Sequence, residues 1–407
     1  ISETSVGDRS AQQEVQGENL NDFVACLTAG GRLKQHAEHD TVRRPERQVN
    51  KFTRNQDKNR FTNAVLFSQG SIDLASEVKE DGPYINASKL PCPGGALIMS
   101  QAPMKETLID FYRLIWQQKI NTIVCLVNLD DHEQCHPYFE KKAGKKITSR
   151  KRFRVRTVAV RSEGKNIVHY ELKIENYLEK SSQTSRVLNV ISIIGWEPDS
   201  NFDVKIVVAA IHSADALKRI VPACENGKSA PMLIHGCSGI RRTGVFALAY
   251  IFSKQILGNR VINLQGVIAT VRNVRYGVLR QKNMFFLLLE VIIALITETG
   301  LVKPGSEDHL QVVQVVKKMY KSSAGKKDGK PKSAPKTPSE KKDDSSRKEK
   351  KKDKRDNKKE EKDDDKEYGG DEDSDATDTT KTSTKTKTGT EGRDRTDKGK
   401  KKNNKKK

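Results

Sequence analysis

The sequence lacks the cysteine patterns of disulfide-bonded and zinc-binding proteins. Its 407 residues contain six cysteines, none of them in a Cys-x-x-Cys pair or at the spacing of a metal site. Scattered thiols of this kind are typical of a reducing compartment, so the composition predicts an intracellular protein without a metal. The six are Cys26, Cys92, Cys125, Cys135, Cys224 and Cys237.

Long apolar stretches are also missing. A membrane-spanning helix needs about 18 or more consecutive apolar residues. The longest run here, 284–296, is interrupted by Glu290 and predicts a buried helix. We therefore expect no membrane span. The chain begins at Ile1 rather than Met, which leaves room for an upstream targeting segment.

The last part of the chain is poor in apolar and aromatic residues. From Lys321 to Lys407 it consists mainly of Lys, Asp, Glu, Ser, Thr and Gly, and Tyr368 is its single aromatic residue. Such a segment cannot bury enough apolar surface to offset the entropy lost on ordering, so we expect a disordered, charged tail. The expected organisation is a disordered N-terminus at 1–18, a folded domain at 19–300, a linker or short helix at 301–320 and the tail at 321–407.

The formal net charge of +22 is spread over both parts of the chain. The tail contributes about +10 of it, although its charge is not uniform. Residues 348–359 and 401–407 are strongly basic, whereas 363–378 are acidic. These runs are open to two interpretations: solvating segments, or a surface that binds an acidic protein, nucleic acid or an import receptor.

Between residues 51 and 297, segments with the period of strands alternate with segments that have the period of helices. Strands are predicted at 120–127, 152–160, 167–174, 186–194 and 232–235, with a turn at 162–165 that joins two of them. Helices are predicted at 20–36, 105–118, 243–257, 264–274 and 283–297. Interleaved strands and helices predict an α/β fold, in which helices flank both faces of a mixed sheet.

The most informative segment is HGCSGIRRTG at 235–244, between a predicted strand and a predicted helix. A glycine-rich turn in this position directs backbone N–H groups and the positive end of the helix dipole at one small volume, which suits a dianion. Arg242 adds a planar guanidinium that can bind two phosphate oxygens. The predicted phosphate-binding residues are His235, Gly236, Ser238, Gly239, Ile240, Arg241 and Arg242.

This segment resembles the signature of the protein tyrosine phosphatases, HCxxGxxR followed by Ser or Thr and Gly. Four more motifs of that family occur in the family's order: NQDKNRF (55–61), YINAS (84–88), QAPMKETLIDFYRLIWQQKINTIVCLVNL (101–129), and Cys135 with Tyr138 and Phe139. On these motifs the chain is identified as a divergent member of the classical family, and it resembles the non-receptor phosphatases of nematodes. The resemblance covers residues 52–297 and implies the protein tyrosine phosphatase fold, a twisted mixed sheet flanked by helices, here with a disordered charged tail.

The resemblance also implies a reaction, and the sequence departs from what that reaction needs. In this family a cysteine thiolate attacks phosphorus, an aspartic acid on a mobile loop protonates the leaving oxygen, and a glutamine orients water. Gly236 holds the nucleophile's place, and Cys237 comes one residue late. Attack requires reacting atoms aligned within about 3–3.5 Å, so we expect Cys237 to be a half-buried thiol without a catalytic role.

Other functional positions are displaced or replaced as well. The acid, Asp199, follows Trp196 one residue late, and Gln281 is one residue late, because Arg280 and Met284 stand at the family's two glutamine positions. In the expected substrate pocket, Phe61 keeps the ring of the family's tyrosine without its hydroxyl. Asn63 replaces an aspartate that anchors the peptide backbone.

Three interpretations follow. The chain is a catalytically impaired pseudophosphatase that binds a phosphotyrosine-containing or other acidic protein through Arg242 in signalling. Alternatively, it is an active cysteine-dependent phosphatase that carries out dephosphorylation with Cys237, Asp199, Arg242 and Gln281 in altered loops. A third interpretation is a scaffold whose basic tail binds acidic polymers or nucleic acid. No cofactor is implied, and the expected location is cytoplasmic or, through the basic tail, nuclear.

Overall fold

The computed structural model describes residues 19–29, 48–198, 200, 202–220 and 229–324. The strands are β1 Ser71–Asp73, β2 Tyr84–Cys92, β3 Gly95–Gln101, β4 Thr122–Cys125, β5 Lys146–Ser149, β6 Phe153–Glu163, β7 Ile167–Asn176, β8 Ser185–Ile193 and β9 Met232–Gly236. The helices are α1 Leu20–Ala29, α3 Asn50–Thr53, the 3-10 turn η2 Gln56–Lys58, α4 Leu108–Gln117, α5 Val204–Ile220, α6 Arg241–Leu257, α7 Leu264–Val274, α8 Lys282–Glu298 and α9 Glu307–Ala324.

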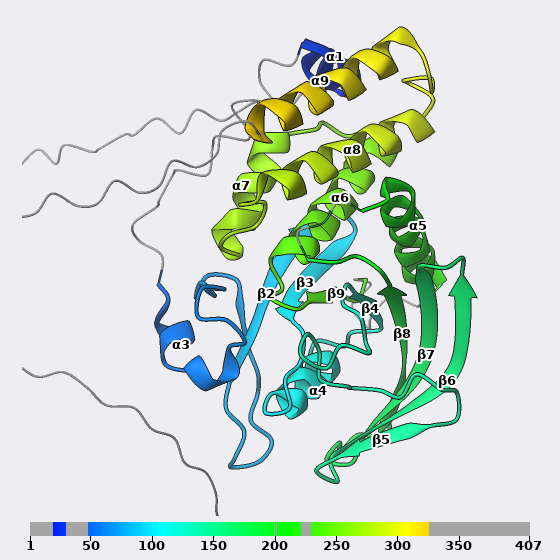
Figure 1. Ribbon diagram of the computed structural model, residues 1–407. Helices are drawn as coiled ribbons and strands as arrows, with labels where there is room; N and C mark the ends of the chain where they lie inside the picture. Colours follow the sequence, from blue (N-terminus) through cyan, green and yellow to red (C-terminus); the bar gives the residue numbers. More distant parts are fainter. Residues whose placement is uncertain (1–18, 30–47, 199, 201, 221–228, 325–407) are drawn as a thin grey trace, which may run out of the picture. The chain divides into compact units, whose positions relative to one another are not determined.

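The strands form one twisted sheet in the order β1-β2-β3-β9-β4-β8-β7-β6-β5 (Figure 1). The four central strands, β3, β9, β4 and β8, are parallel, and the outer pairs are antiparallel. Parallel strands are buried on both faces, which explains why β4 and β9 consist mainly of apolar residues. The mixed sheet flanked by helices that the sequence predicts is confirmed.

Side chains of β9 point alternately into two hydrophobic cores. Met232 and Ile234 face the core under α5, α6, α7 and α8, whereas Leu233 faces the core under α4. Leu233 pairs with Ile98 of β3 and with Ile123 of β4, so β9 lies at the centre of the sheet. The carboxyl ends of parallel strands are where open α/β sheets bind ligands, and β9 ends there at Gly236.

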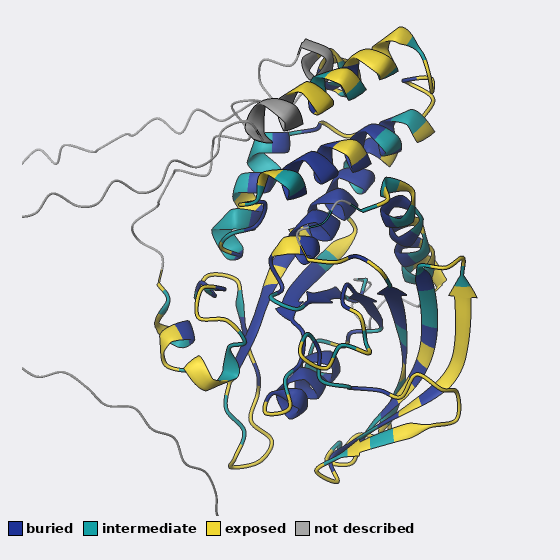
Figure 2. Ribbon diagram, in the orientation of Figure 1, coloured by how far each residue is buried: buried dark blue, intermediate teal, exposed yellow. Residues whose placement is uncertain are grey.

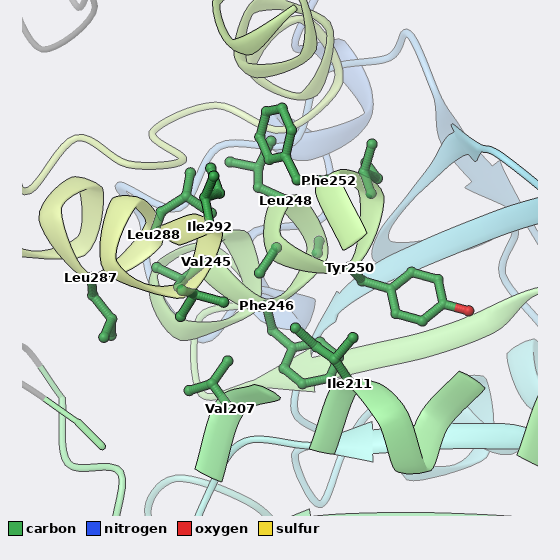
Figure 3. Packing of buried hydrophobic residues seen from close by; sticks show 14 of the residues in the cluster. Val207, Ile211, Val245, Phe246, Leu248, Tyr250, Phe252, Leu287, Leu288 and Ile292 are labelled. Carbon is green, nitrogen blue, oxygen red and sulfur yellow. The ribbon is translucent and has the colours of Figure 1, made fainter. Parts of the chain in front are cut away.

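Helix α6 is buried on nearly all sides. Val207 of α5 and Ile292 of α8 belong to the same core cluster as Phe246 of α6 (Figure 3). Figure 2 shows the burial concentrated in α6, α8 and the central strands, while most of β6 is exposed. A helix that is buried on nearly all sides is fixed by its neighbours, so the N-terminus of α6 has one defined position at the end of β9.

Helices from both ends of the described chain extend the core beyond α8. Val312 and Val316 of α9 are buried with Phe23 of α1 in the cluster that contains α8. The spacing of these valines is that of one helical stripe. Helix α9 begins within the segment 301–320, which the sequence predicts as a linker or short helix, and ends just beyond it. Among the described residues, no helix is long and apolar enough to cross a membrane.

Several predicted elements are found with shifted ends. Helix α7 has the predicted bounds, α6 begins two residues early, and the predicted hairpin forms β6 and β7. The first helix is described over 20–29, and the rest of its predicted range lies outside the described residues. Strands β2 and β3 and helix α5 were not predicted. Strands β2 and β3 contain buried polar residues, including Asn86 and Ser100, so they show no regular alternation, and the apolar run in β3 is only four residues long.

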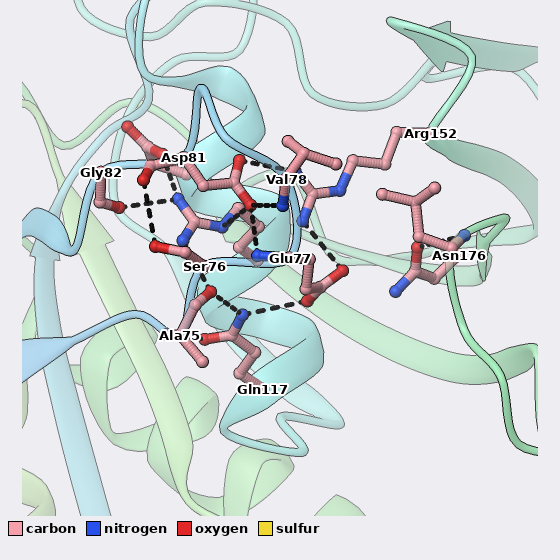
Figure 4. A network of polar contacts seen from close by, with 12 residues as sticks. Ala75, Ser76, Glu77, Val78, Asp81, Gly82, Gln117, Arg152 and Asn176 are labelled. Carbon is pink, nitrogen blue, oxygen red and sulfur yellow. Dashed lines mark hydrogen bonds and ion pairs between the residues drawn. The ribbon is translucent and has the colours of Figure 1, made fainter.

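A buried ion network holds the loop between β1 and β2 against α4 and the start of β6 (Figure 4). Asp81 accepts a hydrogen bond of 2.7 Å from Arg152 and lies 3.4 Å from Arg113. Each arginine has a second carboxylate, Asp110 at 2.8 Å and Glu77 at 2.9 Å. Burial raises the pKa of Asp81, but the hydrogen bonds from Arg152 and two backbone N–H groups and the charge of Arg113 outweigh it and lower the pKa to about 2.

Replacing this carboxylate tests the network. Asp81→Asn leaves both arginines with one carboxylate each, so we expect the free energy of unfolding to fall by about 1.5–3 kcal/mol at pH 7 in urea denaturation. The lowered pKa stabilises the folded state above about pH 4, and this contribution disappears as the pH falls towards about 2. The difference in free energy of unfolding between the parent protein and Asp81→Asn should therefore shrink as the pH falls from about 4 to about 2.

The matched control is Asp73→Asn, which removes an exposed ion pair of 2.7 Å with Lys51. Exposed pairs contribute little, so its effect should be about 0.5 kcal/mol or less. Equal losses in the two variants would contradict a structural role for the buried network.

Candidate functional site

A cavity of about 680 Å³ lies at the carboxyl end of β9. Cavities that bind small groups commonly measure about 300–1,000 Å³. Segments far apart in the sequence line this one: Phe61, Asn63, Ala64, Gln134, Pro198, the turn residues 236–243, Tyr276, Gly277, Arg280 and Gln281. The structure thus brings together the predicted phosphate-binding and substrate-pocket residues, except His235.

Gly239 allows the turn at the base of the cavity to lie against β3. Its φ is +68°, and a Cβ at this position would lie 2.5 Å from the carbonyl group of Ser100. Only glycine fits both the backbone angle and the space. The N–H of Ala102 donates a hydrogen bond of 2.8 Å to the carbonyl oxygen of Gly236, so β3 fixes the beginning of the turn as well.

Arg275, at the C-terminal end of α7, holds the same turn from outside the cavity. It is fully buried, and it donates from Nε to the carbonyl oxygen of Gly239 and from Nη2 to that of Ser238, both at 3.1 Å. Burial lowers the pKa of Arg275 to about 10, so the side chain stays charged at neutral pH. The sequence places Arg275 in register with the family but does not reveal this contact.

His235 lies behind the turn rather than in the cavity. Its ring is fully buried, and Nε2 lies 2.9 Å from the hydroxyl of Tyr138. Burial lowers the pKa of His235 to about 3, and the charge of Arg60 acts in the same direction. The imidazole is therefore neutral, and it orders the base of the turn without a direct path to a ligand in the cavity.

Gly236 faces the hydroxyl of Thr243 at the place where the phosphatase signature has its cysteine. A Cβ at position 236 would lie 2.6 Å from Thr243 Oγ1. This hydroxyl is buried and has no hydrogen-bond partner among the described atoms. A thiolate at 236 would accept its hydrogen bond, whereas glycine leaves the buried donor without an acceptor.

Cys237 lines the cavity, but its surroundings favour the thiol over the thiolate. The side chain is half-buried and packs against the core under α4, together with Leu129 and Val168. Burial raises the pKa of Cys237, and the charges of Arg60 and Arg242 only partly oppose this. A catalytic cysteine requires the reverse shift, because the thiolate is the nucleophile.

Arg242 joins the turn to two other segments of the site. It is 5% exposed, and it donates one hydrogen bond to the carbonyl oxygen of Trp196 and another, of 2.7 Å, to Gln134 Oε1. The amide of Gln134 donates in turn to Asp131 at 2.7 Å. Gln134 was not predicted as a site residue, and only its place beside the Cys135 motif could have indicated it.

The loop expected to hold the catalytic acid is anchored by its tryptophan. Trp196 is 2% exposed, and its ring stacks on Phe202 with 5.0 Å between ring centroids and 4° between planes. Pro198 lines the cavity, while Glu197 is exposed. Asp199 lies outside the described residues, so its predicted role stays a prediction.

Asn59 connects two of the family's motifs through hydrogen bonds. Its Oδ1 accepts hydrogen bonds from the hydroxyl of Tyr84 at 2.5 Å and from the amide of Asn86 at 2.8 Å. These contacts tie the segment before Phe61 to β2. Phe61 is 40% exposed at the cavity, where the exposed ring of Tyr276 also lies. Tyr276 was not predicted as a site residue, because no motif marks the position after Arg275.

The charges of the cavity are of one sign. Arg241, Arg242 and Arg280 line it, and the described lining residues include no Asp or Glu. Together with the N-terminus of α6, which begins at Arg241, this makes a site suited to a dianion. The part of the chain that the structure describes contains no cluster of His, Cys, Asp or Glu that could hold a metal ion.

Comparisons with known proteins agree with this geometry. A sequence model of the protein-tyrosine phosphatase family matches residues 55–294. The chain is 23% identical over 287 residues to receptor-type tyrosine-protein phosphatase F of Rattus norvegicus, which covers 68% of this chain and 14% of that protein. It is 26% identical over 244 residues to the tyrosine-protein phosphatase Lar-like of Caenorhabditis elegans, which covers 58% of this chain and 10% of that protein.

The chain thus spans only about a seventh or less of the length of these relatives. Among solved structures, the catalytic domain of human protein tyrosine phosphatase non-receptor type 18 has a TM-score of 0.57 at 18% identity, covering 68% of this chain and 98% of that one. This likeness concerns the fold. Because the family match extends over more than half of the chain and the signature turn forms the base of the cavity, the chain belongs to the protein-tyrosine phosphatase family.

Proposed function

We propose that this phosphatase domain binds phosphotyrosine on a partner protein without hydrolysing it. The observation that carries the proposal is Gly236, which lies at the base of a cavity lined by arginines and faces the hydroxyl of Thr243, a group with no hydrogen-bond partner in the described part of the chain. Phosphoryl transfer in this family needs a thiolate at that position. The residues around it can still receive the phosphate.

The cavity offers a place for each part of phosphotyrosine. The N-terminus of α6 and Arg242 face the volume that a phosphate dianion would occupy, and charge-assisted hydrogen bonds are the strongest that a site of this kind makes. The rings of Phe61 and Tyr276 lie at the wall and can pack on the phenyl ring. Binding therefore needs no residue that this chain has lost.

Cys237 is a poor replacement for the missing nucleophile. Burial raises the pKa of its thiol, and the side chain packs towards the core under α4. The hydroxyl of Thr243 lies next to position 236. These features favour the pseudophosphatase over the enzyme that would use Cys237, Asp199 and Gln281.

We also propose that the protein is intracellular and that its folded domain extends through α9. The described thiols Cys92, Cys125, Cys135 and Cys237 are all free, which suits a reducing compartment where phosphotyrosine is found. Burial of Val312 in the core cluster that contains α8 supports including α9 in the domain. Binding of nucleic acid or acidic polymers by the tail concerns residues outside the described part of the chain.

Binding can be measured with a fluorescent phosphotyrosine peptide whose flanking residues are uncharged. We expect the full chain to bind it, and Arg242→Ala to weaken binding at least about tenfold, because a charge-assisted hydrogen bond contributes about 1.5–3 kcal/mol. Fluorescence anisotropy gives the dissociation constants, and circular dichroism checks the fold.

The control for charge is Arg156→Ala, since Arg156 is exposed on β6 and does not line the cavity. It should change the affinity less than about twofold at moderate salt. Arg280→Ala serves as a second, exposed cavity variant with an expected loss of about two- to fivefold. Absence of binding by the parent, or binding unaffected by both cavity variants, would refute the proposal.

Hydrolysis is tested with para-nitrophenyl phosphate. The parent and Cys237→Ser should both release no nitrophenol above the buffer blank, because position 236 has no thiol and Cys237 is held in its neutral form. Gly236→Cys is the matched gain-of-function variant. Thr243 can move aside by changing χ1, and we expect slow turnover above that of the parent. Turnover by the parent that disappears in Cys237→Ser would establish the active enzyme instead.

A further inference from the structure

We propose that the outer part of the sheet, formed by β5, β6 and β7, binds the surface of a membrane that contains anionic lipids. The face concerned is the one that points away from α4, and we call it the basic face. It is separate from the cavity, so membrane binding here is independent of the phosphotyrosine binding proposed above.

A row of positive side chains crosses these three neighbouring strands. Lys146 of β5 lies opposite Arg156 of β6, and Arg156 lies opposite Lys173 of β7. All three side chains are exposed. Like charges directly opposite each other destabilise a sheet, because their Cβ atoms are only about 4.5–5.5 Å apart. Since the fold gains nothing from such a row, its presence indicates an anionic ligand.

The alternation of side chains along the strands places this row on one face. Val155 of β6 and Leu172 and Ile174 of β7 are buried in the core under α4. Successive side chains of a strand point to opposite faces, so Arg156 and Lys173 point away from that core. On this other side of the sheet, helix α5 packs against β4 and β8, while β5 and most of β6 are exposed (Figure 2).

Few carboxylates neutralise the row. Lys173 lies 3.5 Å from Glu175, but the other oxygen of Glu175 is 3.2 Å from Arg154. The other two cations of the row form no ion pair with any residue that the structure describes. Glu171 is the next exposed side chain of β7 on this face. The basic face therefore keeps a net positive charge.

The turn between β5 and β6 adds two cations. Arg150 and Lys151 have φ angles of 46° and 53°, and the N–H of Arg152 donates a hydrogen bond of 2.9 Å to the carbonyl oxygen of Ser149. Asn and Gly are favoured at both positions of such a turn, because other residues are strained there. Strain of this kind is often found at functional sites. The two exposed side chains extend the positive surface to the end of the hairpin.

Exposed apolar side chains lie beside the cations. Val187 of β8, which is opposite Lys173, is 55% exposed. Tyr177 and Leu178, in the turn after β7, are 45% and 40% exposed, and the guanidinium of Arg154 lies 5.1 Å from the centre of the Tyr177 ring. Such side chains next to Lys and Arg are typical of surfaces that enter the headgroup region of a bilayer. They favour a membrane over an acidic peptide or a nucleic acid, which offer no apolar phase.

The basic face and the two turns at its end carry enough charge for reversible binding. Each Lys or Arg near an anionic membrane raises the affinity about fivefold, and salt screens this attraction. We therefore expect binding that weakens as the salt concentration rises. The exposed cations are Lys146, Arg150, Lys151, Arg156, Lys173 and Lys180.

Binding through this face leaves the cavity open. Ser185, at the start of β8, pairs with Glu175 beside the basic face. Ser192, near the other end of β8, pairs with Cys125, which pairs with His235 at the signature turn. At about 3.3 Å a residue, Ser185 and Ser192 are roughly 23 Å apart along the strand. A ligand can thus enter the cavity while the domain lies on a membrane.

The first experiment measures binding of the full chain to lipid vesicles by sedimentation. Vesicles of phosphatidylcholine with about 30 mol % phosphatidylserine should bind it, and vesicles of phosphatidylcholine alone should not. The triple variant Lys146→Gln, Arg156→Gln, Lys173→Gln should bind the anionic vesicles at least about tenfold more weakly. In urea denaturation it should be at least as stable as the parent, because it removes like charges that lie opposite each other.

The matched control is the triple variant Arg260→Gln, Lys303→Gln, Lys318→Gln, which removes three exposed cations outside the basic face. It changes the net charge equally and leaves the basic segments after residue 321 as they are. Its affinity for the vesicles should fall about twofold or less. Leu178→Ser tests the apolar contact: it should weaken vesicle binding about threefold and leave binding to polyglutamate unchanged.

The second experiment locates the contact within the full chain. Lysines are acetylated with and without the anionic vesicles, and mass spectrometry compares the extent of modification at each. Lys146, Lys151 and Lys173 should be protected at least about threefold, because they contact the headgroups. Lys303 should be modified equally in both samples.

Three outcomes would contradict membrane binding by the basic face. The first is absence of binding to the anionic vesicles. The second is vesicle binding that is equal in the parent and the first triple variant, without protection of Lys146 and Lys173, which would assign the contact to another basic segment. The third is a triple variant that loses binding to a DNA duplex or to polyglutamate but not to vesicles. Each leaves the proposed function standing, because the phosphotyrosine peptide is measured without vesicles.

Discussion

The close approach of the signature turn to β3 is the constraint on which the rest of the site depends. Gly239 has a positive φ and lies so near the backbone of Ser100 that no side chain fits between them. Arg275 holds the carbonyl groups of the turn from the opposite side. Because β9 precedes the turn and the buried helix α6 follows it, the turn keeps its shape without a cysteine at position 236.

The electrostatics of the site separate binding from catalysis. Buried His235 is neutral, and burial raises the pKa of Cys237, so neither group favours the thiolate chemistry of the family. The arginines and the helix dipole are independent of that chemistry, since they act on any dianion. Under the proposed function, the absence of a thiol at position 236 removes the covalent step, while these groups remain available to bind an anion.

The agreement between predicted and observed elements follows from their burial patterns. The hairpin of β6 and β7 and the helix α7 have one apolar face each, and their periods could be read directly. Strands β2 and β3 could not be read in this way. They are buried on both faces and carry Asn86 and Ser100, whose hydrogen-bond partners lie far away in the sequence or on the neighbouring strand.

The sequence by itself determined the family, the glycine-rich signature turn and the absence of cysteine at position 236, because each depends on the order of residues in short motifs. Only the tertiary structure decided how Gln134, Tyr276 and Arg275 take part, since segments remote in sequence meet there at the carboxyl end of one strand. It also decided the direction in which the pKa of the Cys237 thiol is shifted. The pKa of a thiol depends on its burial and on the charges beside it, and neither can be read from its neighbours in the chain.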